Sequence, residues 1–259
     1  MSFTQKQSRE LESARHVLEH PGLAARIGDL VGTPIERGFE LLPPNWNKAV
    51  NEATRKSVEK AFDFALSTLD PDSARPPSNR WHKVSAGTSG ALGGAFGLAA
   101  LAVELPISTT IMLRSIADIA RSQGEDLSTP EARLQCIQVL ALGGPSKNDD
   151  AAEAGYFAAR AGLAKAVSDA ASHLASKGLS SSGAPAVVRL VSQIAARFSI
   201  VVSEKAAAQA IPIVGAFGGA LINTLFIEHF QAMGNAHFTI RRLERIHGCE
   251  EVRLQYQRR

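Results

Sequence analysis

A short pattern, Gly-Ala-(Leu or Phe)-Gly-Gly-Ala, occurs twice in this chain, and each copy lies in a long stretch almost free of charge. The first stretch, residues 84–113, contains one charged side chain, Glu104, and the second, residues 206–227, contains none. Small residues four positions apart share one face of a helix and allow two backbones to approach closely. The glycines to which we assign this packing role are Gly90, Gly93, Gly94, Gly97, Gly215, Gly218 and Gly219. The repeat therefore predicts two central helices that are rich in glycine and poor in charge.

The rest of the chain has helical periodicity between proline and glycine breaks, without a sustained alternating strand pattern. We therefore predict an all-α, multi-helix bundle. We expect Pro106 to begin a new helix after a break, and Ser128 with Glu131 to form a capping box. The expected helices span about 7–20, 45–69, 81–105, 107–122, 128–143, 149–177, 186–210 and 213–247.

A proline-containing loop at residues 70–80 suggests how the chain is divided. We expect residues 1–80 to form an N-terminal helical arm, which ends in this loop, and residues 81–259 to form the glycine-rich core. The two parts are expected to belong to one continuous domain.

Charge and cysteine content exclude several classes of protein. The net charge of +3 is too small to indicate nucleic-acid binding. Cys136 and Cys249 are far apart and have no metal-ligand spacing, so we predict no structural metal, no cofactor and a reducing, cytoplasmic location. Arginines concentrate in the last residues of the chain, where they either contact anionic lipid or are solvated.

The two charge-poor stretches raise the question of membrane insertion. A spanning helix needs about 20 predominantly apolar residues. The six strongly apolar residues of 84–103 contribute only about −2 to −4 kcal/mol before the glycine and polar residues oppose insertion. Residues 213–227 are more apolar but short, and they include Asn223. Burial in a soluble core, shallow membrane association and full spanning all remain open.

Glu104 is the first candidate site residue, because a carboxylate in an apolar stretch needs a partner. Arg114, Asp118 and Arg121 follow at helical spacing, and an arginine would meet Glu104 if the chain folded back at Pro106. The alternative is an exposed glutamate beside an ordinary surface ion-pair stripe.

The final long helix carries a second group of candidates, which are Asn223, Glu228, His229 and His237. The two histidines are eight positions apart, too far for one metal ion, and are otherwise ordinary core or edge residues. No Gly-x-Ser-x-Gly or nucleotide-binding glycine motif occurs, so we assign no catalytic residue.

Two segments resemble the bacterial EcsC protein family. They are the run from Gly90 to Gly124 and the run from Ile211 to Thr224, the latter followed by Phe238 to Leu243. The resemblance covers about residues 30–250, and family members often carry an aspartate near the Glu104 position. It implies a helical, intracellular bacterial protein with a membrane connection, because the family is named for a protein encoded beside an ABC transporter. It implies no catalytic residue.

We therefore expect a non-enzymatic, membrane-associated protein that binds lipid, or an ABC-transporter-type membrane protein, through its glycine-rich helices. It is expected on the inner face of the cytoplasmic membrane and is a candidate homo-oligomer. One alternative is a soluble scaffold or oligomerisation module. Another is a hydrolase, which requires Glu104, His229 or His237 to lie in a concave pocket beside another polar group.

Overall fold

The computed structural model describes residues 3–20, 22–68, 97–142, 155–177, 183–211 and 215–258. Within these ranges the chain forms α-helices and one 3-10 turn, and no strand, which confirms the all-α bundle. The helices are α1 (Gln5–Glu19), α2 (Leu23–Val31), α3 (Ile35–Glu40), α4 (Trp46–Thr68), α6 (Gly97–Ser122), α7 (Pro130–Gln138), α8 (Gly155–Lys177), α9 (Pro185–Ala210), α10 (Gly215–His247) and α11 (Cys249–Gln257), with the 3-10 turn Val139–Ala141 after α7.

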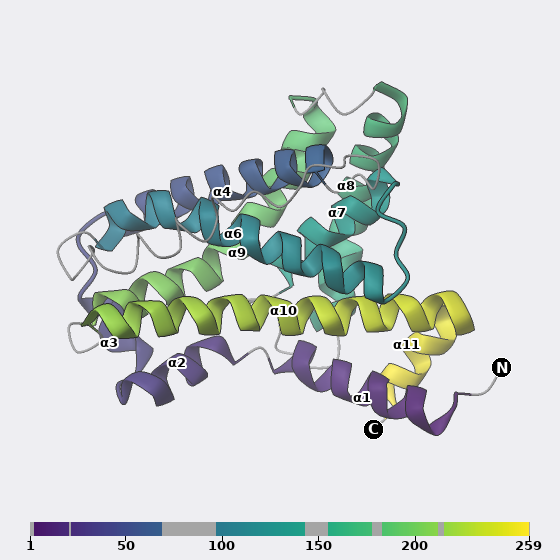
Figure 1. The fold of residues 1–259 in the computed structure, drawn as a ribbon, viewed down its shortest axis with the longest axis horizontal. Coiled ribbons are helices and arrows are strands. Elements are labelled where there is room, and N and C mark those ends of the chain that lie inside the picture. The colour runs from purple at the N-terminus through teal and green to yellow at the C-terminus, as the bar shows by residue number, and fades with distance from the viewer. Residues whose placement is uncertain are drawn as a thin grey trace.

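The long helix α10 runs the length of the molecule, and several of the other helices pack against it (Figure 1). Helix α1 packs along its C-terminal part, α6 packs against it from the other side, and α9 crosses the bundle to meet α3 and α4. A single hydrophobic core joins residues from α1 to α11. The predicted boundary near residue 80 lies outside the described residues, but the helices on both sides of it share this core.

One end of the bundle brings together the N-terminal ends of α6 and α10 and the C-terminal end of α9, at the left of Figure 1. Helix α3 is held there by a close backbone approach, since a Cβ atom at Gly38 would lie 2.2 Å from the Ala207 carbonyl oxygen. Only glycine allows this contact. We call this region the glycine-rich end, because α6 begins at Gly97 and α10 begins at Gly215 here.

Three sequence expectations need correction. Helix α6 continues through Pro106 instead of breaking there. The carbonyl that Pro106 leaves unpaired belongs to Ala102, which is exposed, so water can satisfy it. Thr129, and not Ser128, caps α7 by accepting a hydrogen bond from the Ala132 amide. The helices α2, α3 and α11 were not predicted; α11 follows α10 after Gly248, whose φ of 88° permits the turn.

The predicted packing role of the glycines stays a prediction at most of the seven positions. Gly90, Gly93 and Gly94 lie outside the described residues, and the surroundings of Gly97, Gly215 and Gly218 are not described. At Gly219 an added Cβ would meet no atom within 4 Å. The close approaches among the described glycines occur instead at Gly38 and at Gly234, where an added Cβ would lie 3.3 Å from Ile116 Cγ1.

Candidate functional site

Glu104 meets a buried lysine from another helix at the glycine-rich end. Lys205 of α9 is fully buried, and its Nζ atom donates to both carboxylate oxygens of Glu104, each at 2.8 Å. The same ammonium donates to Asn223 Oδ1 at 2.9 Å and lies 4.4 Å from the centre of the Phe226 ring. All three donors of the ammonium group are therefore used. The contacts join α6, α9 and α10 at one point.

Burial dominates the electrostatics of this cluster. Removing the ammonium group from water lowers the pKa of Lys205, and Glu104 opposes the shift without abolishing it. The Glu104 side chain keeps 23% of its surface exposed, whereas that of Lys205 keeps none. The pair therefore has one hydrated member and one dry member. This geometry is suited to holding three helix ends together in an apolar setting.

Sequence reasoning found Glu104 and Asn223 but missed Lys205. Of the two arrangements considered for Glu104, the continuous helix prevents an arginine of α6 from folding back on it, and the alternative of an exposed glutamate without a buried partner does not hold either. The available signal was helical spacing. Lys205 falls on the same stripe as Phe198, Val201 and Val202, which are fully buried. A lysine on a buried stripe requires an anionic partner, and Glu104 is the one charge in the other apolar stretch.

Glu204 lies next to Lys205 in the chain but has no hydrogen-bond or ion-pair partner among the described residues. Burial raises the pKa of its carboxyl group to about 7. At neutral pH this side chain is therefore partly protonated.

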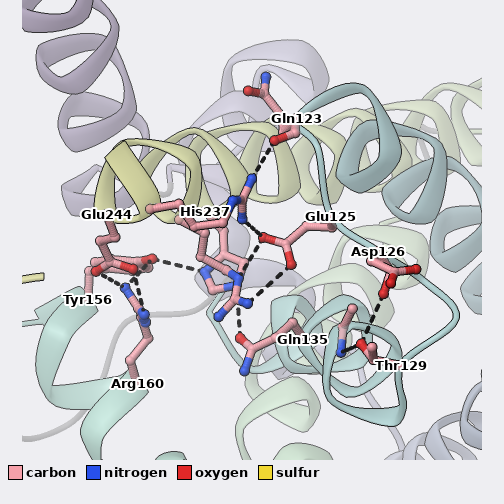
Figure 2. A network of polar contacts seen from close by, with 12 residues as sticks. Gln123, Glu125, Asp126, Thr129, Gln135, Tyr156, Arg160, His237 and Glu244 are labelled. Carbon is pink, nitrogen blue, oxygen red and sulfur yellow. Dashed lines mark hydrogen bonds and ion pairs between the residues drawn. The ribbon is translucent and has the colours of Figure 1, made fainter. Parts of the chain in front are cut away.

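His237 is the centre of a second polar cluster, near the C-terminal end of α10 (Figure 2). The ring is fully buried, with Nδ1 2.9 Å from the Tyr156 hydroxyl and Nε2 3.2 Å from Gln135 Oε1. Arg160 donates to the Tyr156 oxygen, so the Tyr156 proton points to His237 Nδ1. The ring then donates from Nε2 to Gln135. Both nitrogens are satisfied in the neutral form.

Two arginine–glutamate pairs enclose this histidine. Arg160 binds both carboxylate oxygens of Glu244, at 2.7 and 3.0 Å, and Arg241 binds both oxygens of Glu125, at 2.9 and 3.1 Å. Burial, together with the positive charges of Arg160 and Arg241, lowers the pKa of His237 well below its usual range. Burial also raises the pKa of Tyr156. Neither His237 nor Tyr156 is therefore poised to exchange a proton near neutral pH.

Three of the C-terminal arginines, Arg241, Arg242 and Arg245, are engaged within the protein. Arg242 pairs with Glu10 at 2.7 Å, and Arg245 pairs with Glu125 and donates to the Gln123 carbonyl oxygen. Burial raises the pKa of Glu125, but Arg241 and Arg245 outweigh it and hold that pKa below its ordinary value. Arg241, Arg242 and Arg245 are therefore paired within the protein, which differs from both predicted alternatives, lipid contact and free solvation.

The remaining predicted residues lie apart from both clusters. Arg114 is exposed, and Asp118 pairs with Arg121 on the surface of α6 at 2.9 Å. Glu228 forms an exposed ion pair with Arg26 at 3.1 Å, which is worth little in water. His229 is buried and its ring packs edge-on against Phe230.

The described structure gives the hydrolase alternative no support. Both oxygens of Glu104 are held by Lys205, and His237 is inaccessible with both ring nitrogens bonded. Across the described residues, no group of three or more potential metal ligands is gathered.

The family model described as the EcsC protein family matches residues 5–243, which is most of the chain, so the protein belongs to this family. The match begins earlier than the resemblance seen in the glycine-rich segments. No curated protein and no solved structure matches the chain.

Proposed function

We propose that this member of the EcsC protein family is a non-enzymatic protein that docks its glycine-rich end on the inner face of the cytoplasmic membrane. The observation that carries the proposal is that three elements reaching that end each expose a large apolar side chain, while the other exposed large apolar residues, Ile111, Val188, Ile246 and Leu254, lie elsewhere on the molecule. Val103 on α6 is 64% exposed, Leu221 on α10 is 43% exposed and Leu41 after α3 is 48% exposed. Ala102 and Ala220, their chain neighbours, are exposed as well.

Helix α9 reaches the same end, and its side chains there are buried or half-buried in the bundle. Among the described helices it is the one long and apolar enough to cross a membrane, and 44% of its most apolar window is buried inside the protein. A core helix of a soluble protein has the same composition. Its C-terminal part reaches the glycine-rich end, where Lys205 is neutralised by Glu104. The bound carboxylate removes a charge that would oppose docking.

We expect the glycine-rich end to enter the membrane only to a shallow depth. Covering Val103, Leu221 and Leu41 removes about half of three large side chains from water, which is worth about 2 to 4 kcal/mol. Such a contribution gives reversible surface binding rather than insertion of a spanning helix. The Lys205 cluster holds the three helix ends as one unit, so the apolar side chains are presented together.

Liposome flotation with paired variants tests this proposal. Val103→Asp and Leu221→Asp place charges at the proposed contact, and together they should reduce the lipid-bound fraction at least tenfold. Leu254→Asp is the matched control, because Leu254 is 52% exposed but lies on α11, away from the glycine-rich end. Equal loss in the control, or no binding of the unmodified protein to anionic or neutral vesicles, would exclude lipid docking.

A further inference from the structure

A groove at the opposite end of the bundle is separate from the proposed membrane contact. It has a volume of about 630 Å³ and opens between α7, α8, α10 and α11. Along α10, Glu244 at the groove lies about 30 Å from Asn223 at the glycine-rich end, from the rise of an α-helix. The volume falls in the range typical of small-ligand sites.

Two nearly buried glutamines line this groove, and much of their side-chain hydrogen-bonding capacity is not used within the protein. Gln138 is 2% exposed and lines the groove, yet its side chain has no hydrogen-bond partner among the described residues. Gln135 is 7% exposed, and its Oε1 atom accepts from His237 Nε2 (Figure 2). The Gln135 amide nitrogen is left with two N–H donors. Their unpaired amide atoms are not sealed off from the groove, where water or a ligand can satisfy them.

His237 fixes how Gln135 is presented. The neutral ring, set by Tyr156, donates from Nε2 and so requires the oxygen of Gln135. This contact turns the amide NH2 group away from the ring. Gln138 supplies one carbonyl acceptor and two further donors. Together the two side chains match a ligand that carries both carbonyl and N–H groups.

The walls of the groove add shape and charge. Helix α8 contributes a row of small side chains, together with Phe157 and Val167; the small residues are Ala158, Ala161, Ala164, Ser168, Ala171 and Ser172. At the rim, Glu131 and Glu250 offer negative charge and Arg253 offers positive charge, and none of the three has an ion-pair partner among the described residues. The site therefore presents amide partners, a small-residue wall and charges of both signs.

We propose that this groove binds a short peptide in extended form. A peptide supplies backbone carbonyl and N–H groups for Gln135 and Gln138, small side chains for the α8 wall and termini or side chains of both charges for the rim. Four extended residues span about 13 Å. The ligand is either a free peptide or a segment of a longer protein, and the chemistry recognised is the same.

The test uses tetra-alanine, with free termini and with acetyl and amide caps, and 15N-labelled protein. The side-chain amide signals of Gln135 and Gln138 should shift and saturate as peptide is added, up to about 10 mM. Stronger binding of the free form identifies a free peptide as the ligand. Equal or stronger binding of the capped form identifies a chain segment.

Variants decide whether binding occurs in this groove. Ala164→Trp, at an exposed position of the α8 wall, should abolish the shifts, and Gln138→Ala should weaken binding about tenfold. Ser13→Trp places the same side chain in the separate groove between α1 and α10 and should leave binding unchanged. Absence of shifts with both peptides, or shifts that survive Ala164→Trp, would overturn the proposal.

Discussion

Lys205 and Glu104, which are separated by 101 positions in the chain, form a buried ion pair in which the ammonium donates to both carboxylate oxygens at 2.8 Å. The lysine is the fully dry partner, and the glutamate is the partly hydrated one. The pair ties α6 to α9 at the end of the bundle that we propose as the membrane contact. Its energetics are therefore the first part of the account to test.

Glu104→Gln should destabilise the protein by about 3 kcal/mol, because it leaves the buried ammonium of Lys205 without a counter-charge. Urea denaturation measures the change. The double variant Glu104→Leu/Lys205→Met should lie within about 1 kcal/mol of the parent, since it removes both the attraction and the cost of burying the lysine. If Glu104→Gln alone is as stable as the parent, Lys205 is not buried as a cation.

Acid should destabilise the protein through His237. Its pKa in the folded state is depressed, so the unfolded chain binds the additional proton as the pH falls below about 6.5. The stabilising contribution is present above that pH and declines by at most about 1.4 kcal/mol for each pH unit below it. We expect the urea midpoint of the parent to fall more steeply between about pH 7 and pH 5 than that of His237→Gln. Parallel curves would contradict the neutral, fully bonded histidine.

Glu204 should give the stability of the protein the opposite pH dependence. Its pKa in the folded state is about 7 instead of the ordinary 4.5, so the folded protein holds the proton more tightly than the unfolded chain. Stability from this group is complete below about pH 4.5 and is lost as the pH rises through 7. Glu204→Gln should therefore stabilise the protein by about 1 to 3 kcal/mol near pH 8 and have little effect near pH 4. The same stability gain at both pH values would rule out this explanation.

Gly38 should tolerate no side chain. A methyl group there would overlap the Ala207 carbonyl oxygen, which belongs to the backbone of α9 and cannot move aside cheaply. Gly38→Ala should cost about 2 kcal/mol or more. Gly162→Ala in α8 is the matched control, because no atom lies within 4 Å of the added group, and it should stabilise the helix by about 0.5 to 1 kcal/mol. Thermal unfolding of the two variants should shift in opposite directions.

Local sequence patterns predicted the ends of several long helices, because proline and glycine act over one or two turns, but they missed the short helices α2, α3 and α11. The last long helix was expected to end at about His247, as it does, and the helix expected over 149–177 ends at Lys177 as α8. Pro106 misled the prediction, because a proline in a helix is tolerated when the carbonyl it leaves unpaired belongs to an exposed residue. Thr129 and Ser128 are both adequate caps, and the sequence does not decide between neighbours.

The clusters were only partly predictable, because their members come together through long-range packing. Glu104 and Asn223 were identifiable as polar residues in apolar stretches. Lys205 directly follows Glu204, and two adjacent charged residues are typical of an exposed helix surface. His237 was singled out for its residue type, whereas its partners Tyr156 and Gln135 carry no local signal. Their positions depend on how α7 and α8 pack against α10.

The most direct test of membrane docking is fractionation of cells that express the protein natively, with successive salt and alkaline-carbonate washes of the membrane pellet. The account predicts that the protein is found with the membranes, remains there through the salt wash, because the contact is apolar, and is released by carbonate. Complete recovery in the soluble fraction would contradict membrane docking, and retention through carbonate would contradict a shallow contact.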